Sequence, residues 1–186
     1  QNLIKKNIGI FIFDNVEILD FTGPYEVFFS ARLSEKKYYD ISKLPSPFNI
    51  YTISESNKKI ITTGGLKVSS DYTVTNCPKP DILIIPGGIG TRALLNNIKI
   101  INWIKSNKNI ELLASICTGS LLLAKANLLH NKQATTHWGA YKLLKQLIPL
   151  KLIREEWLIQ KFGATDFKNA SGIVRQIFVK VVNEDL

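Results

Sequence analysis

A cysteine interrupts one of the most apolar stretches of the chain. The segment LLASICTGSLLLA, residues 112–124, is apolar on both sides of Cys117, which is followed by Thr118, Gly119 and Ser120. A buried strand or helix gains no packing from Cys-Thr-Gly-Ser. If a strand ends just before Cys117 and a helix starts just after it, the thiol lies on the sharp turn of a nucleophile elbow.

The N-terminus of such a helix lowers the pKa of a thiol and so favours the nucleophilic thiolate. The alternative is a buried, inert cysteine, because free cysteine is among the most buried residue types. The strand-to-helix position of Cys117 favours the nucleophile. Cys77, in TNCPKPD, precedes a strand with no base nearby and is interpreted as structural.

A proton-transfer carboxyl is predicted at Asp20, in the apolar context EILDFTGPYEVFF. Asp is also a good helix cap, which is the structural alternative. Beside a thiolate, both desolvation and the thiolate charge would raise the pKa of a carboxyl. Such an acid hydrogen-bonds the thiolate and delivers a proton at neutral pH. Glu17 is a weaker rival for this role.

A glycine-rich loop, PGGIG, follows the apolar run DILII and supplies Gly87 and Gly88. Glycines after a strand can serve only a tight turn. Opposite a nucleophilic thiol, however, the Gly88 amide is predicted to join the Thr118 amide in binding the negative charge that develops on a substrate. His137, in TTHW, is a further candidate at the same sheet edge, although a lone histidine is more often structural.

The elements that must position these groups follow an alternating pattern, in which short apolar runs are separated by amphipathic segments. This pattern predicts an α/β fold with a parallel sheet, whose sites lie beyond the carboxyl ends of the strands. Strands are predicted at residues 8–13, 48–54, 80–85, 110–116 and 132–138, and a small hairpin is predicted to turn on Gly64-Gly65. The first helix is predicted to be capped by Thr22 or Gly23, with Pro24 in its first turn. Further helices are predicted to span 91–108 with a break at Asn96-Asn97, and to cover 119–127 and 139–148. After Pro149 the signals weaken, with a strand and loop over 154–167 and a helix or strand over 172–182.

The composition indicates one domain, residues 1–186. Its net charge of +9 comes from scattered lysines without a dense basic block, which argues against nucleic acid as a partner. No apolar run is long enough to span a membrane. The two cysteines form no CxxC pair and the two histidines have no metal-ligand spacing. These features favour a reducing, cytoplasmic setting and no metal site.

Four segments taken together resemble the ThiJ/PfpI superfamily of class I glutamine-amidotransferase-like proteins. They are GIFIFDNVEILDFTGPYEVF, PDILIIPGGIG, SICTGSLLLAKANLL and ATTHW, in this order, and the resemblance covers about residues 7–147. Within the superfamily they are closest to the isocyanide hydratases and to the amidase-like domains of AraC-type regulators. The resemblance implies a flavodoxin-like three-layer α/β/α sandwich with a nucleophile elbow.

The same resemblance implies residue roles and an activity. Cys117 is then the nucleophile, Asp20 the general acid and base, and the backbone amides at Gly88 and Thr118 line the pocket. Thr118 stands where protease-like members carry His, which removes their general base. The expected reaction is cofactor-free hydration of an isocyanide to an N-substituted formamide, catalysed by a homodimer.

Two alternatives stay open. One is a non-enzymatic redox or ligand sensor, and the other is a glyoxalase- or deglycase-like enzyme. The regulators continue into a helix-turn-helix domain, which we do not expect in this sequence. The GGG(V/I)TAGID-like segment of the hydratases is reduced here to KNASGIVRQIFVKVV, with Ser171-Gly172 as its remnant.

Overall fold

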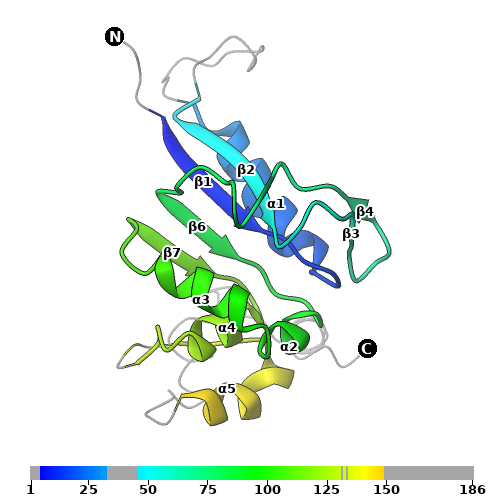
Figure 1. Cartoon of the computed structure of the whole chain (residues 1–186), viewed down its shortest axis with the longest axis vertical. Coiled ribbons are helices and arrows are strands. Elements are labelled where there is room, and N and C mark those ends of the chain that lie inside the picture. The colour runs from blue at the N-terminus through cyan, green and yellow to red at the C-terminus, as the bar shows by residue number, and fades with distance from the viewer. Residues whose placement is uncertain (1–4, 33–45, 131, 133, 149–186) are drawn as a thin grey trace, which may run out of the picture.

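Five parallel strands form the central sheet in the order β5-β2-β1-β6-β7 (Figure 1). The computed structural model describes residues 5–32, 46–130, 132 and 134–148. The strands are β1 (Lys6–Phe11), β2 (Phe48–Ser54), β5 (Tyr72–Thr73), β6 (Ile82–Ile85) and β7 (Leu112–Ser115). The predicted parallel α/β fold is confirmed.

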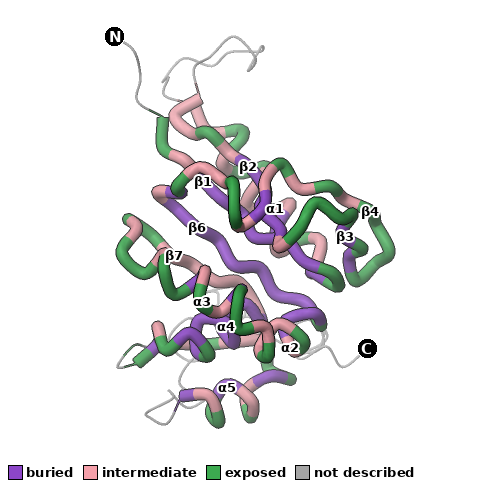
Figure 2. The backbone as a smooth tube through the Cα atoms, in the orientation of Figure 1, coloured by how far each residue is buried: buried purple, intermediate pink, exposed green. Residues whose placement is uncertain are grey.

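The inner strands form because their residues are apolar on both faces. Ile8, Ile10 and Phe11 of β1 have no exposed surface, and Figure 2 shows β6 buried along its whole length. Continuous apolar runs of this kind are typical of parallel strands covered by helices on both sides. Each such side chain stabilises the fold by about 1.5–3 kcal/mol relative to its exposed state.

Helices cover both faces of this sheet. From β1 the chain crosses through helix α1 to β2 on one side, whereas from β6 it crosses through α2 and α3 to β7 on the other side. Right-handed crossovers that run in opposite directions place their helices on opposite faces. The helices are α1 (Ile18–Ser30), α2 (Thr91–Leu94), α3 (Ile98–Ser106), α4 (Gly119–Lys125) and α5 (Tyr141–Leu147). The result is the flavodoxin-like α/β/α arrangement.

Two local predictions are confirmed by backbone geometry. Strands β3 (Ile60–Ile61) and β4 (Lys67–Val68) form an antiparallel hairpin, in which Gly65 has φ +82°. The helical segment after β6 breaks at Asn97, whose side chain accepts a hydrogen bond from the Ile100 amide and caps α3.

Helix α1 begins at Ile18 with Glu17 as its N-cap, five or six residues before the predicted cap, and Pro24 lies inside it. Tertiary contacts set this start, because the Glu17 amide donates to the Gly87 carbonyl at 2.9 Å. The N-terminal preference of proline therefore gave the wrong boundary.

The strand predicted at 132–138 is wrong. Residues 134–137 lack regular secondary structure and lead into a short 3-10 helix, η2 (Trp138–Ala140). Side-chain hydrogen bonds replace a strand ladder here: Thr136 donates to the Cys117 carbonyl, and His137 Nδ1 accepts from the Gly139 amide.

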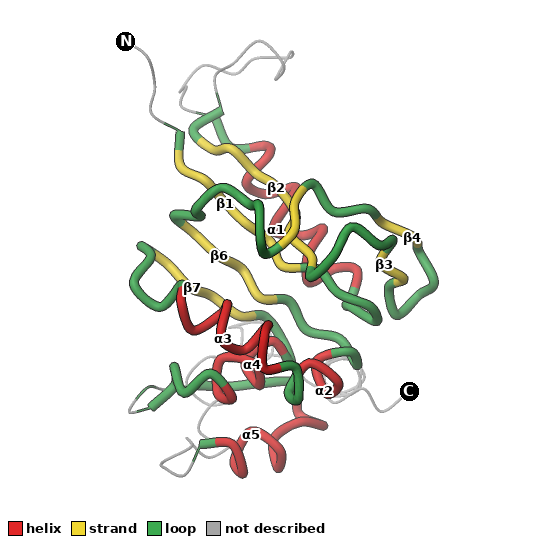
Figure 3. The backbone as a smooth tube through the Cα atoms, in the orientation of Figure 1, coloured by secondary structure: helices red, strands yellow, loops and turns green. Residues whose placement is uncertain are grey.

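The predictions for 154–167 and 172–182 lie outside the described residues. In the described part of the chain, no helix is long and apolar enough to cross a membrane. Figure 3 shows that the loops after β1, β6 and β7 leave the sheet at the same edge. Asp20, the glycine loop and Cys117 follow these three strands, so the fold gathers the predicted site residues at one edge.

Candidate active site

Cys117 lies on a tight turn between β7 and α4. Its φ of +51° is in the left-handed region, which costs a residue with a Cβ about 1–3 kcal/mol. The turn brings α4 against β6 so closely that a Cβ on Gly119 would lie 2.0 Å from the Ile85 carbonyl oxygen. Only glycine fits there, which explains the glycine two positions after the cysteine. The half-buried Cys117 is thus presented on a nucleophile elbow.

Asp20 lies in the first turn of α1, and its carboxyl is hydrogen-bonded to the Cys117 thiol. The Gly87 amide donates to Asp20 Oδ2 at 2.9 Å. Since Glu17 is the N-cap of α1, the alternative role of Asp20 as a helix cap does not apply.

The environment of Asp20 favours its protonated form. Burial raises the pKa of Asp20 above its ordinary value, and the nearby charge of Glu17 raises it further. The hydrogen bonds from Gly87 and Cys117 and the charge of His137 act in the opposite direction, but the net shift of this pKa is upward. A carboxyl held in this way can give a proton to, and take one from, an atom next to the thiol.

Gly87 lets three groups of the site converge. A Cβ at this position would lie 2.7 Å from the Thr118 nitrogen, 2.8 Å from Asp20 Oδ2 and 2.8 Å from the Cys117 Cβ. Real Cβ atoms do not approach other heavy atoms so closely, so a larger residue would push the carboxyl and the elbow apart. The second residue of the loop therefore sets the spacing between acid and thiol.

Gly88 is held by a buried hydroxyl pair instead of facing a substrate. Its amide donates to Thr118 Oγ1 at 3.0 Å, and its carbonyl accepts from Thr118 Oγ1 at 3.1 Å and from Thr91 Oγ1 at 2.8 Å. The Gly88 amide is therefore not available as the predicted donor to a developing negative charge. Gly88 also has φ +125°, and a Cβ there would lie 2.3 Å from the Asn15 carbonyl oxygen.

Thr118 thus has two separate roles in the site. Its hydroxyl ties the glycine loop to the elbow, while its amide nitrogen is among the groups that converge on Gly87. The sequence drew attention to Thr118 as the replacement for a histidine, but it did not reveal this tie. Thr91 was missed altogether, because nothing local marks a threonine in a short helix as the partner of a residue 27 positions away.

His137 lies near the acid, since its charge lowers the pKa of Asp20. Its Nε2 atom is buried, and its ring packs on that of Trp138 with 5.4 Å between centroids. Its neighbour Thr136 contacts the elbow directly. The structure therefore brings Asp20, Gly87, Cys117, Thr118 and His137 together.

Cys77 has a different environment from Cys117. Burial raises the pKa of the Cys77 thiol, which disfavours its thiolate. Among the described residues, no group of three or more His, Cys, Asp or Glu side chains is arranged to hold a metal ion.

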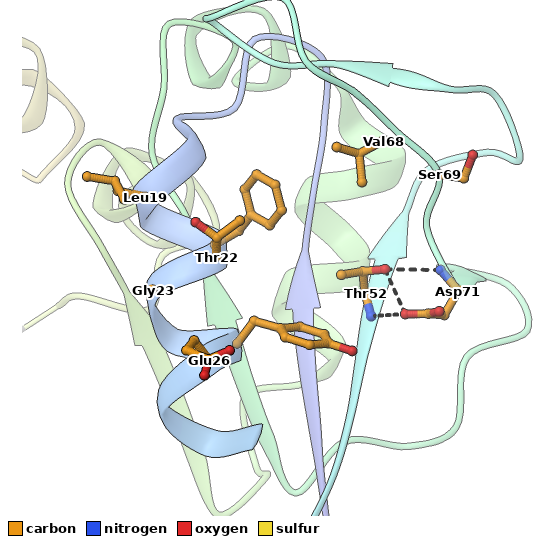
Figure 4. Close-up of a pocket in the computed structure, with 10 residues that line it drawn as sticks. Leu19, Thr22, Gly23, Glu26, Thr52, Val68, Ser69 and Asp71 are labelled. Carbon is orange, nitrogen blue, oxygen red and sulfur yellow. Dashed lines mark hydrogen bonds between the residues drawn. The ribbon is translucent and has the colours of Figure 1, made fainter. Parts of the chain in front are cut away.

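A groove of about 660 Å³ lies beside α1, over the end of β2 (Figure 4). Thr52 and Asp71 form its polar end, where Asp71 Oδ2 accepts from the Thr52 amide and hydroxyl at 2.8 Å each. Leu19, Tyr25 and Val68 contribute apolar walls. Neither Cys117 nor Asp20 lines this groove, so it is separate from the elbow.

Residues 6–155 match the DJ-1/PfpI family. Isonitrile hydratase of Pseudomonas putida is 33% identical over 163 residues, which is 85% of this chain and 65% of that protein. The HTH-type transcriptional regulator GbdR of Pseudomonas aeruginosa is 24% identical over 150 residues, or 80% of this chain and 38% of the regulator. The chain thus spans less than two thirds of the length of either relative.

The solved structures agree on the fold. A ThiJ/PfpI family protein from Pseudomonas syringae superposes with a TM-score of 0.67 at 20% identity, covering 98% of this chain and 88% of that one. Since the family match covers most of the sequence and the elbow and sheet are those that the family motifs implied, the chain belongs to the DJ-1/PfpI family.

Proposed function

We propose that this protein is a cofactor-free lyase that hydrates an isocyanide to an N-substituted formamide. The observation that carries the proposal is the hydrogen-bonded pair of Cys117 and Asp20, in which a nucleophile on a strained elbow meets a carboxyl with a raised pKa. The likeness to an isonitrile hydratase supports this chemistry.

The first step forms a covalent adduct. The Cys117 thiolate attacks the terminal carbon of the isocyanide, a carbon–sulfur bond forms, and Asp20 gives its proton to that carbon. The product is a thioimidate in which the carbon is bound to sulfur and doubly bound to nitrogen. The raised pKa of Asp20 supports this step, because the carboxyl must hold a proton before it can donate one.

The second step releases the product. The Asp20 carboxylate takes one proton from a water molecule, whose oxygen adds to the thioimidate carbon, and passes that proton to the nitrogen. The carbon–sulfur bond then breaks, the hydroxyl proton returns to Asp20, and the formamide leaves. Cys117 is again a thiolate and Asp20 again an acid, so the two residues complete the cycle without a cofactor.

Thr118 and His137 have supporting roles in this proposal. The Thr118 amide lies among the groups around Gly87, where a donor would stabilise negative charge that develops during attack. His137 moderates the pKa of Asp20 through its charge. With Thr118 after the nucleophile, the chain lacks the histidine base that protease-like family members carry there.

The test is a substrate panel that contains aryl and alkyl isocyanides, methylglyoxal and small amides. We expect formamide from at least one isocyanide with the wild type, and none from Cys117→Ala. Conversion of methylglyoxal alone would favour the glyoxalase-like alternative. Full turnover of an isocyanide by Cys117→Ala would rule out the proposed nucleophile.

A thiol-based redox or ligand sensor is the second candidate. The similarity to HTH-type regulators favours it, and so does the groove beside α1, which offers a ligand site apart from the thiol. Mild peroxide followed by peptide mass spectrometry separates the two functions. A sensor would oxidise selectively at Cys117 and leave isocyanides unconsumed, whereas the enzyme would consume isocyanide.

We also propose that the protein works as one domain in a reducing setting such as the cytoplasm, without metal. Cys77 and Cys117 are not joined in a disulfide, and the proposed chemistry needs Cys117 reduced. Dialysis against EDTA is expected to leave the turnover rate unchanged. A loss of turnover that added metal restores would contradict this expectation.

A homodimer completes the proposal. Leu19 and Val27 on α1 are 75% and 68% exposed, and a Cβ on Gly23 between them would meet nothing within 4 Å. Such an apolar stripe with a small residue at its centre suits close approach of a second copy. Light scattering should give twice the chain mass, and Val27→Lys should shift it toward the monomer.

A further inference from the structure

The carbonyl of Cys117 accepts two hydroxyl hydrogen bonds. One comes from Ser120 at 3.1 Å, within the first turn of α4. The other comes from Thr136 at 3.2 Å, across 19 residues of sequence. Thr136 lies in a segment without regular secondary structure, so this contact is a specific tie between that segment and the elbow.

Holding this carbonyl also holds the donor on the other side of the same peptide unit. The peptide bond between Cys117 and Thr118 is planar and trans, so its C=O and N–H point in opposite directions. The Thr118 nitrogen is one of the three groups that converge on Gly87. A hydroxyl bound to the carbonyl thereby fixes the direction in which the Thr118 N–H points.

The same hydroxyl opposes relaxation of the backbone. Cys117 has φ +51°, a conformation that persists at a non-glycine residue only where the surroundings hold it. If the turn relaxed, the thiol would move relative to Asp20, to which it is hydrogen-bonded. Ser120 holds the carbonyl from within the turn and would move with it, whereas Thr136 holds it from outside.

We propose that Thr136 is a positioning residue, whose hydroxyl clamps the Cys117–Thr118 peptide and keeps the thiol aligned with Asp20. This proposal rests on the proposed role of Cys117 as the nucleophile, but it concerns the presentation of the thiol and not the identity of the substrate. Thr136 also directly precedes His137, whose charge acts on Asp20.

A double-mutant cycle on the thiol tests the clamp. The rate of alkylation of Cys117 by iodoacetamide at neutral pH is measured by peptide mass spectrometry, with Cys77 as an internal reference. The rate is compared between each protein and its Asp20→Asn version. The series contains the wild type, Thr136→Val, Thr136→Ser, which keeps the hydroxyl, and Thr135→Val, a control at an exposed neighbour.

In the wild type, Asp20→Asn should change the alkylation rate about tenfold, the size expected for a hydrogen bond to a charged group. In Thr136→Val we expect this effect of Asp20→Asn to fall to about twofold. It should stay near tenfold in Thr136→Ser and Thr135→Val. If valine is not accommodated and the variant is unfolded by circular dichroism, Thr136→Ala takes its place against Thr136→Ser.

Three results would overturn the clamp: a full effect of Asp20→Asn in the folded Thr136→Val, an equal loss of that effect in Thr135→Val, or no effect of Asp20→Asn in the wild type. Isocyanide turnover, measured on the same proteins, separates the two proposals. If Asp20→Asn loses its effect on the alkylation rate in Thr136→Val and the wild type turns over no isocyanide, the clamp is supported and the hydratase is contradicted. If the wild type turns over isocyanide and Asp20→Asn keeps its full effect in Thr136→Val, the hydratase is supported and the clamp is contradicted.

Discussion

The buried hydroxyl of Thr118 offers a quantitative test of how the glycine loop is held against the elbow. In Thr118→Val a methyl group replaces Oγ1, and the Gly88 amide loses the acceptor that lies 3.0 Å away. The residue is 3% exposed, so water cannot readily replace that acceptor. A buried donor without a partner costs about 1–3 kcal/mol.

Steric crowding adds to this cost. The new methyl carbon would lie about as close to the nitrogen and oxygen of Gly88 as Oγ1 does now, at 3.0 and 3.1 Å, which is inside van der Waals contact for carbon. Crowding of this kind costs about 1 kcal/mol or more. The free energy of unfolding should therefore fall by about 2–4 kcal/mol, which lowers the Tm by about 5–15 °C for a chain of this size.

Thr91→Val is the matched control. It also removes a buried hydroxyl from the pair, but the Gly88 carbonyl that loses the Thr91 donor still accepts from Thr118. The new methyl group meets the same kind of crowding, since Thr91 Oγ1 lies 2.8 Å from the Gly88 carbonyl oxygen, but no buried donor loses its acceptor, so the cost should be about 1–2 kcal/mol. Urea unfolding followed by circular dichroism measures both variants. The reasoning fails if Thr118→Val stays within about 0.5 kcal/mol of the wild type, or if Thr91→Val is equally destabilised.

Three further predictions concern the carboxyl of Asp20, the crowding around Gly87 and an ion pair on the surface. Asp20→Asn should be more stable than the wild type at neutral pH, because ionisation of a carboxyl with a raised pKa lowers the free energy of unfolding as the pH rises. This gain should vanish toward pH 3.8. A variant less stable than the wild type at neutral pH would contradict the prediction. Gly87→Ala should lose about 1–3 kcal/mol in urea unfolding, whereas Gly23→Ala, with open space at its Cβ, should be neutral or slightly stabilised; equal losses would refute the crowding argument. Lys6→Ala removes an exposed ion pair with Glu111 and should change the free energy of unfolding by less than about 1 kcal/mol in thermal melts; a larger loss would show that the pair is structural.

The sequence predicted what local pattern determines. Continuous apolar runs identified β1, β2, β6 and β7, and the asparagine pair located the break before α3. Small residues after Cys117 predicted the elbow, because only glycine allows α4 to approach the β6 backbone so closely. The placement of Asp20 beside the thiol followed from sheet topology, since strands in parallel order bring their carboxyl ends together.

Contacts between distant segments could not be predicted in this way. The start of α1 depends on a hydrogen bond from the Glu17 amide to the Gly87 carbonyl, and helix propensities do not take such a distant contact into account. The Gly88 amide was predicted to face a substrate because its side-chain competitor, the Thr118 hydroxyl, lies 30 residues away. The threonines of TTHW suit a strand locally, but Thr136 bonds to the elbow instead of to a neighbouring strand.

The central claim is that Cys117 and Asp20 together hydrate an isocyanide. It is tested most directly by the rate of formamide formation from an isocyanide at neutral pH in the wild type, Cys117→Ala and Asp20→Asn. Loss of the nucleophile should abolish turnover, and loss of the acid should lower it by about 10²–10⁴-fold, the usual contribution of general acid–base catalysis. A wild-type protein that forms no formamide, or an Asp20→Asn variant as fast as the wild type, would contradict the claim.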